Sequence, residues 1–208
     1  MAEFDKSYWE DDWRAAPAQQ DHAVVVNPYL PTELEDIPAG TVLDAGCGTG
    51  TEAMWLADHR WDVTAADISA TALATARARA AHTGLDTRIE WIEADLARWE
   101  PDRTWDLVVT SYAHADIGQL ALYRRITEWV APGGTILIIG HTHDDDHSSE
   151  HGGNDHPEDA TATLKSVTAL FRNPGWQIDT ASENTRTVHP GGVPVTLRDV
   201  IVRAHRLI

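Results

Sequence analysis

The sequence predicts one α/β domain built on a mostly parallel sheet, and three observations support this fold class. From Gly40 onward, short apolar runs alternate with segments of helical spacing, a pattern typical of a parallel sheet with helices on both faces. The run at residues 105–111 is almost continuously apolar, as in a strand buried on both faces. A chain of 208 residues, 42% of them hydrophobic, is long enough to bury a sizeable core.

The first predicted strand, residues 41–45, runs directly into a glycine-rich turn and then into a helix at 51–59. Gly46, Gly48 and Gly50 let the backbone turn tightly and let a ligand approach the main chain. The helix that follows begins with unpaired N–H groups. The turn is therefore typical of a nucleotide-binding loop. A dinucleotide fingerprint, G-x-G-x-x-G, would require glycine at position 51, where this chain has Thr51.

Asp44 stands at the end of this strand. Its carboxylate would repel a pyrophosphate but suits a ligand that carries an ammonium and a sulfonium, such as S-adenosylmethionine. The stretch Leu-Asp-x-Gly-Cys-Gly-Thr-Gly at 43–50 resembles motif I of the class I, Rossmann-like methyltransferases. The alternative is a tight turn in some other α/β protein. The resemblance implies that S-adenosyl-L-methionine is bound by Asp44, Gly46, Cys47, Gly48, Thr49 and Gly50.

The second strand, residues 61–66, leads into Asp67, and a helix capped by Ser69 follows until Gly84. Asp67 lies 21 residues beyond Gly46, and an acid at the end of the second strand can accept both ribose hydroxyls of an adenosine. Ile68 is placed to pack on the adenine ring. The alternative is that Asp67 merely precedes the capped helix.

The third strand, residues 88–94, is followed by Asp95 and Leu96, which we assign to the cofactor site. The resemblance implies that Asp95 hydrogen-bonds the adenine amino group, and a solvated turn aspartate is the alternative. The fourth strand, 105–111, ends in a loop at the sheet edge where open α/β folds bind ligands. Ser111 and Tyr112 are therefore expected to border the methionine part of the cofactor. His114 is expected beside the methyl acceptor, as a catalytic or a structural histidine.

The remaining elements complete the sheet. We expect a helix at 117–130, a Pro-Gly-Gly turn at 132–134, a fifth strand at 135–140, a helix at 158–171 and two final strands at 176–182 and 195–204. In class I methyltransferases the last two strands form a hairpin that inserts the final strand antiparallel beside the fifth. The resemblance therefore implies a seven-stranded sheet of order 3-2-1-4-5-7-6.

Five histidines fall within residues 141–156, among several aspartates. Imidazoles and carboxylates are metal ligands, so a metal site is one interpretation. The spacing is irregular and glycines and serines interrupt it, which favours a solvated loop without a metal. His141 leaves the fifth strand at the same edge as His114. Both histidines are candidates for a general base.

Residues 1–39 are expected to form an N-terminal extension or lid, and residues 40–208 the cofactor-binding domain. Residues 4–31 show no sustained helical or alternating period. Their aromatic side chains either anchor the extension to the core or close over the site. We select Tyr8, Trp9 and Trp13 as lid residues.

Sixteen basic and thirty-three acidic residues give a net charge of -17, which disfavours nucleic acids as substrates. The single cysteine, Cys47, excludes an internal disulfide and a cysteine-based zinc site. No signal peptide is visible and no apolar stretch approaches membrane-spanning length. We therefore expect a cytoplasmic protein that does not engage a membrane and is a monomer or homodimer.

The function that these features predict is methyl transfer to a small-molecule S-, O- or N-nucleophile. Such a transfer is an in-line displacement, in which holding the reactants in line supplies much of the catalysis. The size, the aromatic extension and Asp67-Ile68-Ser69 look most like the thiopurine and tellurite-resistance group of methyltransferases. The alternatives are an NAD(P)-dependent oxidoreductase and a non-catalytic protein that binds a cofactor or metal.

Overall fold

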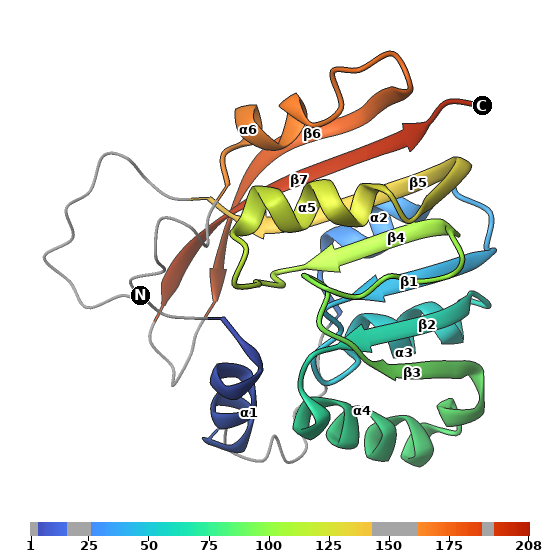
Figure 1. The fold of residues 1–208 in the computed structure, drawn as a ribbon, viewed down its shortest axis with the longest axis vertical. Coiled ribbons are helices and arrows are strands. Elements are labelled where there is room, and N and C mark those ends of the chain that lie inside the picture. Colours follow the sequence, from blue (N-terminus) through green and yellow to red (C-terminus); the bar gives the residue numbers. More distant parts are fainter. Residues whose placement is uncertain (1–3, 16–25, 143–161, 189–193) are drawn as a thin grey trace, which may run out of the picture.

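The computed structural model describes residues 4–15, 26–142, 162–188 and 194–208. Its centre is a seven-stranded sheet of order β3-β2-β1-β4-β5-β7-β6 (Figure 1). Strands β1 to β5 pair in parallel, and β7 is antiparallel to both β5 and β6. The predicted strand order and the antiparallel last strand are confirmed. The strands are β1 (Thr41–Ala45), β2 (Asp62–Asp67), β3 (Ile89–Glu93), β4 (Trp105–Ser111), β5 (Val130–His141), β6 (Trp176–Val188) and β7 (Val195–Arg206).

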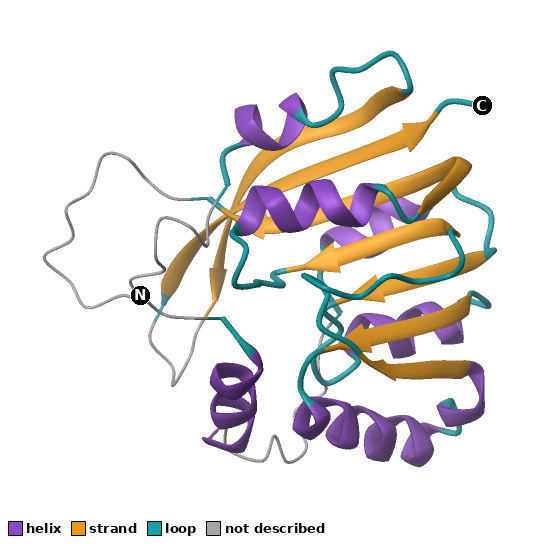
Figure 2. Ribbon diagram, in the orientation of Figure 1, coloured by secondary structure: helices purple, strands orange, loops and turns teal. Residues whose placement is uncertain are grey.

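Helices cover both faces of the sheet, as predicted (Figure 2). Adjacent strand residues Val42 and Leu43 belong to different buried clusters, because successive side chains of a strand point to opposite faces. One cluster includes apolar residues of α5 and α6, and the other those of α2, α3 and α4. The helices are α1 (Lys6–Ala15), α2 (Tyr29–Leu34), α3 (Thr51–Asp58), α4 (Ala70–Thr83), α5 (Gln119–Thr127) and α6 (Leu164–Ala169), with a 3-10 turn η1 (Asp86–Arg88).

The boundaries of α4 follow the predicted capping signals. The Ser69 hydroxyl accepts a hydrogen bond from the backbone N–H of Ala72, and Gly84 ends the helix at a φ of 74°. A serine satisfies one of the unpaired N–H groups at a helix start, and glycine adopts the left-handed conformation at a helix end without a Cβ penalty. Local sequence therefore fixes this helix, which begins at Ala70, three residues after Asp67.

Other boundaries differ from the sequence-based expectation. Strand β5 begins at Val130 and includes the Pro-Gly-Gly segment at 132–134, because Trp105 pairs with Val130 while Leu107 pairs with Thr135. This register shift is a bulge, in which the turn-forming residues of β5 have no paired partner on β4 but remain part of the strand. Helix α6 is shorter than predicted, and residues 158–161 of the expected helix lie outside the described part.

The N-terminal segment contains a helix that the sequence analysis did not predict. Residues 4–31 show no sustained apolar period, yet α1 forms over ten of them. Trp9 and Trp13, four residues apart, share one face of this helix. The helix packs beside the start of α4, close to the carboxyl ends of the parallel strands (Figure 1). Tertiary contacts rather than an extended apolar stripe therefore stabilise it.

Candidate active site

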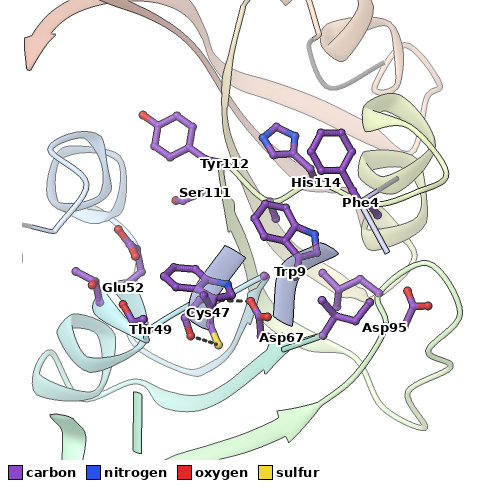
Figure 3. Close-up of a pocket in the computed structure, with 18 residues that line it drawn as sticks. Phe4, Trp9, Cys47, Thr49, Glu52, Asp67, Asp95, Ser111, Tyr112 and His114 are labelled. Atoms are coloured by element: carbon purple, nitrogen blue, oxygen red, sulfur yellow. Dashed lines mark hydrogen bonds between the residues drawn. The ribbon is translucent and has the colours of Figure 1, made fainter. Parts of the chain in front are cut away.

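A pocket of about 290 Å³ lies at the carboxyl edge of the sheet, near the lower end of the size range of small-molecule sites. It is enclosed by α1 and by the loops that follow β1, β2, β3 and β4 (Figure 3). These segments are far apart in sequence and meet because parallel strands end at one edge. The lining residues are Phe4, Trp9, Trp13, Gly46, Cys47, Gly48, Thr49, Thr51, Glu52, Asp67, Ile68, Asp95, Leu96, Ser111, Tyr112, Ala113, His114 and Ala115.

The glycine-rich turn after β1 forms the floor of the pocket. Gly46 has a φ of 83°, and a Cβ there would lie 2.3 Å from the Cβ of Ala113. Gly48 has a φ of 52°, and a Cβ there would lie 3.2 Å from the Trp13 ring. Gly50 precedes α3 as its N-cap and does not line the pocket. Burial raises the pKa of the Cys47 thiol well above its ordinary value, which supports a packing role for this residue.

Asp67 is buried, with 8% of its surface exposed, and faces the pocket from the end of β2. Its Oδ2 accepts a hydrogen bond from the Gly48 N–H at 2.8 Å, and its Oδ1 accepts one from the Ser69 N–H at 2.9 Å. Burial raises the pKa of this carboxyl, although the backbone N–H groups lower it in part. Because each carboxylate oxygen can accept a second hydrogen bond, Asp67 retains capacity to bind ligand hydroxyls.

Asp44 lies behind the pocket lining, with only 1% of its surface exposed. Burial, and then the charges of Glu52 and Asp67, raise the pKa of Asp44 well above its ordinary value. Glu52, in the first turn of α3, lines the pocket and was missed by the sequence analysis. Its Oε1 accepts a hydrogen bond from the Asn27 N–H at 3.2 Å. An acid just after the glycine turn was the signal that could have identified Glu52.

Asp95 and Leu96 line the pocket after β3. The Asp95 carboxylate accepts hydrogen bonds from the Ala97 N–H at 2.9 Å and from Arg98 Nη1 at 2.5 Å. Arg98 also bonds Asp116 at 2.7 Å, so it joins the loops after β3 and β4. Ile68 lines the pocket next to Asp67. The adenine-binding roles of these residues stay predictions.

Ser111 and Tyr112 line the pocket at the end of β4, as placed by the sequence analysis. The Ser111 hydroxyl is buried and has no hydrogen-bond partner among the described residues, so a ligand would be able to satisfy it. Tyr112 has a φ of 56°, a conformation that non-glycine residues rarely adopt. Such backbone strain gathers at functional sites.

A polar network holds Tyr112 from behind; we call it the Asp199 cluster (Tyr29, Tyr112, His141, Arg186 and Asp199). The fully buried Asp199 accepts hydrogen bonds from Arg186 Nε at 2.6 Å and the Tyr29 hydroxyl at 3.0 Å, and it bonds His141 Nδ1 at 3.1 Å. Arg186 also donates to the Tyr112 hydroxyl at 3.0 Å. Burial raises the pKa of Asp199, but the bonds from His141 and Arg186 outweigh this and lower it overall.

The two candidate histidines occupy different places. His114 lines the pocket, whereas His141 does not and stacks on the Tyr112 ring with the ring centroids 4.2 Å apart. His114 stacks on Phe4, with centroids 5.2 Å apart, and its Nδ1 lies 2.7 Å from Gln119 Oε1. The structure therefore brings His114, and not His141, to the pocket wall (Figure 3).

Two of the three predicted lid residues lie at the pocket. Trp9 and Trp13 line the pocket, and Tyr8 packs edge-on against the Trp9 ring outside it. Phe4, which the sequence analysis did not select, lines the pocket beside His114. An apolar aromatic residue just ahead of the lid aromatics was the available signal for Phe4.

The chemistry of the lining fits a cationic ligand that carries hydroxyl groups. Three acidic residues, Glu52, Asp67 and Asp95, line the pocket, and no lysine or arginine is among the described residues that line it. Aromatic faces such as those of Trp9 and Trp13 attract cations, and carboxylates accept hydrogen bonds from hydroxyls. S-adenosylmethionine, with its sulfonium, ammonium and ribose, has this character.

The metal interpretation is not supported within the described residues, where no group of three or more His, Cys, Asp or Glu side chains could hold a metal ion. His143, His147, His151 and His156 lie outside the described residues. Across the described ranges, every helix is too short or too polar to cross a bilayer.

Known proteins resemble this chain over the region that carries the glycine-rich turn. A family model described as a methyltransferase domain matches residues 42–134. An uncharacterized methyltransferase of Mycobacterium tuberculosis is 39% identical over 108 residues, which cover 50% of this chain and 52% of that protein. A probable thiol methyltransferase of Arabidopsis thaliana is 26% identical over 144 residues, which cover 67% of this chain and 63% of that protein. The matched region thus spans about half the length of the mycobacterial relative.

Solved structures show the same fold. TehB from Haemophilus influenzae superposes with a TM-score of 0.73 at 17% identity, covering 98% of this chain and 67% of TehB. A structure described as the conversion of a disulfide bond into a thioacetal group during echinomycin biosynthesis gives a TM-score of 0.64 at 24% identity, covering 86% and 80%. Residues 42–134 of this chain therefore match a methyltransferase domain model, and the sheet as a whole has the fold of these solved structures.

Proposed function

We propose that this protein transfers a methyl group from S-adenosylmethionine to a small-molecule acceptor. The observation that carries the proposal is the pocket at the carboxyl edge of the sheet. There the motif I turn meets three acidic residues and several aromatic rings, and the described lining includes no lysine or arginine. A sulfonium is stabilised by such surroundings. The matching methyltransferase domain at 42–134 supports the same conclusion.

Each lining segment has a role in this proposal. The backbone of the turn, from Gly46 to Thr49 with Cys47 and Gly48, lies against the donor. Asp67 accepts hydrogen bonds from the ribose hydroxyls, for which its two oxygens retain lone pairs. Ile68 and Leu96 pack on the adenine faces and Asp95 accepts from the adenine amino group. Ser111 and Tyr112 border the methionine part, and Asp44 contributes negative charge from behind Glu52.

The acceptor end of the pocket is assigned to Phe4, Trp9 and His114, which contact one another. The bound donor supplies an electrophilic methyl group. The chain holds the acceptor atom in line with that group, excludes water with α1, and offers His114 as a base for acceptors that must lose a proton. His141 supports the Tyr112 side of the pocket through the Asp199 cluster.

A small acceptor fits better than a nucleic acid. The net charge of -17 disfavours approach of a phosphate backbone, and the part of the lining that the structure describes offers no arginine or lysine to hold a phosphate. In this proposal residues 4–15 act as a lid over the domain at 40–208, with Trp9 and Trp13 closing the pocket and Tyr8 supporting Trp9 from outside.

Calorimetry with S-adenosylmethionine and S-adenosylhomocysteine tests the cofactor directly, and we expect micromolar binding of both. Titration of NADH fluorescence tests the nicotinamide alternative in the same buffer. Methyl-labelled cofactor incubated with a panel of thiols, phenols and carboxylates then tests transfer. Binding of NADH without binding of either S-adenosyl ligand would overturn the proposal. Binding without transfer to any acceptor would favour a non-catalytic cofactor-binding protein.

A further inference from the structure

We propose that Gln119 is a positioning residue that fixes the tautomer of His114, so that Nε2 of His114 is the nitrogen that accepts a proton from the methyl acceptor. This inference rests on the proposed methyl transfer. It names the acceptor class as a molecule whose nucleophilic oxygen or sulfur still carries a hydrogen, such as a phenol or a thiol.

The orientation of the Gln119 amide is set by the protein backbone. Its Nε2 donates a hydrogen bond to the carbonyl oxygen of Ala113 at 2.9 Å. A carbonyl oxygen only accepts, so the amide nitrogen must be the atom on this side. The amide oxygen Oε1 consequently faces His114, with Nδ1 of the imidazole 2.7 Å away.

This orientation determines where the proton of His114 resides. Because Oε1 of Gln119 can only accept a hydrogen bond, Nδ1 of His114 must donate it. In a neutral imidazole one nitrogen carries the hydrogen and the other the lone pair. The neutral His114 ring therefore carries its lone pair on Nε2.

Gln119 is buried, with 4% of its surface exposed. A buried amide must form hydrogen bonds to offset the loss of water, and its oxygen and nitrogen do so with the loop at 113–114. Gly118 is the N-cap of α5 and supplies no side-chain cap, and the side chain of Gln119 also turns to the loop rather than to the helix end. These two contacts hold the loop that carries His114, and Gln119 also forms a hydrogen bond with the Tyr123 side chain.

Stacking restrains the plane of the His114 ring. The Phe4 ring lies 5.2 Å away at an interplanar angle of 30°, and the Trp9 ring lies 6.4 Å away at 6°. His114 lines the pocket next to these rings (Figure 3). The hydrogen bond from Nδ1 to Gln119 restrains rotation of the His114 ring within its own plane. The position of Nε2 is therefore set before an acceptor binds. Such preorganisation is what a general base requires.

The acceptor oxygen or sulfur forms a bond to the methyl carbon while its hydrogen passes to Nε2 of His114. The bond between the methyl carbon and the sulfonium breaks, and its electron pair stays on sulfur as a neutral thioether. The resulting imidazolium keeps its Nδ1–H bond to Gln119, and the Phe4 face stabilises the new cation.

The decisive experiment is nitrogen-15 NMR of the histidine side chains in the full-length protein, with and without S-adenosylhomocysteine. His114→Asn assigns the His114 signals. We expect the Nδ1–H tautomer in the parent protein and a shift toward the Nε2–H tautomer in Gln119→Leu. The matched control is Gln177→Leu, because Gln177 is exposed on β6 and the variant should leave the His114 signals unchanged. An Nε2–H tautomer in the parent protein, or an unchanged tautomer in Gln119→Leu, would overturn the inference.

Kinetics with the thiol or phenol that the labelled panel identifies provide a second readout. Gln119→Glu places a carboxylate against Nδ1, which favours the imidazolium, so the acidic limb of the pH–rate profile should move up by about one pH unit. His114→Asn should lower kcat about 100-fold with S-adenosylhomocysteine affinity unchanged. An unaltered kcat would overturn the role of His114. If the parent protein does not bind S-adenosylhomocysteine, the proposed function is overturned. The tautomer of His114 is measured independently of that binding, so the two failures can be told apart.

Discussion

The Glu10 carboxylate of α1 accepts a hydrogen bond from the backbone N–H of Ala70, the first residue of α4, at 2.7 Å. It also accepts one from the Thr71 hydroxyl. The first N–H groups of a helix have no partner within the helix and attract negative charge. Since α4 begins immediately after Asp67 and Ser69, Glu10 connects the aromatic helix α1 to the segment proposed to bind ribose.

Glu10→Ala should release α1 from α4. Loss of a capping interaction costs about 1 kcal/mol of stability. If the docked position of α1 over the pocket is destabilised by this amount, S-adenosylhomocysteine should bind about fivefold more weakly. Hydrogen exchange of residues 6–15 should accelerate in this variant. Asp11→Ala is the matched control, because Asp11 lies on the same helix with 74% of its side chain exposed and pairs with Arg14 of that helix. Equal exchange in the two variants would contradict the docking role.

Asp67→Ala should weaken S-adenosylhomocysteine binding about 10- to 100-fold, since hydrogen bonds to a charged group contribute about 1.5–3 kcal/mol. The variant also removes the acceptor for the N–H groups of Gly48 and Ser69. Calorimetry measures the affinity. Asp62→Ala changes an exposed acid at the opposite end of β2 and should bind like the parent protein. Parent-like affinity of Asp67→Ala would contradict the ribose assignment.

Asp44→Asn should stabilise the protein at neutral pH while it weakens binding of S-adenosylmethionine. Burial raises the pKa of Asp44 above its ordinary 3.8, so the native state binds this proton more tightly than the unfolded state does. The stability that the protonated Asp44 contributes is fully present below the pKa that Asp44 has in the unfolded chain. It is lost as pH rises through the higher pKa that Asp44 has in the folded protein. The variant should therefore have the higher Tm at pH 7.5, by about 2–4 °C per kcal/mol, and the difference should shrink toward pH 4. A lower Tm at pH 7.5 would contradict this.

Arg186→Gln should destabilise the protein by about 2 kcal/mol at pH 7.5, because the buried Asp199 loses a hydrogen bond from a charged partner. The lowered pKa of Asp199 means that its contribution is present above the unfolded pKa and is lost as pH falls through the folded pKa. Urea unfolding at pH 7.5 and pH 2.5 should show the difference narrowing at the lower pH, which lies below the ordinary pKa of 3.8. Arg88→Gln, at an exposed position in η1, should have little effect at either pH.

Metal removal should leave the activity unchanged. The described residues offer no cluster for a metal, and the proposed displacement needs only a positioned acceptor and a base. Protein dialysed against a chelator should bind S-adenosylhomocysteine and transfer methyl groups at the parent rate. Activity that disappears on chelation and returns on readdition of a divalent metal would assign a metal site to the histidine-rich segment.

Much of the fold was readable from local sequence. The strand order rests on a resemblance carried by residues 43–50, and α4 rests on Ser69 and Gly84, whose capping geometry is local. Helix α1 was not predicted because its contacts are with residues distant in sequence, such as Ala70. The bulge that opens β5 was missed for a similar reason, since pairing with β4 overrides the turn preference of the Pro-Gly-Gly segment.

The residues of the candidate site also fall into those that the sequence predicts and those that only the structure reveals. By itself the sequence determined the glycine turn, the acids after β2 and β3, and the loop that carries His114, because each follows directly from one strand end. Only the tertiary structure decided that Phe4 and Glu52 enter the pocket, that His141 lies behind Tyr112, and that Gln119 bonds His114. Side-chain direction depends on packing and hydrogen-bond partners from other segments, and residue type and spacing along the chain do not encode those partners.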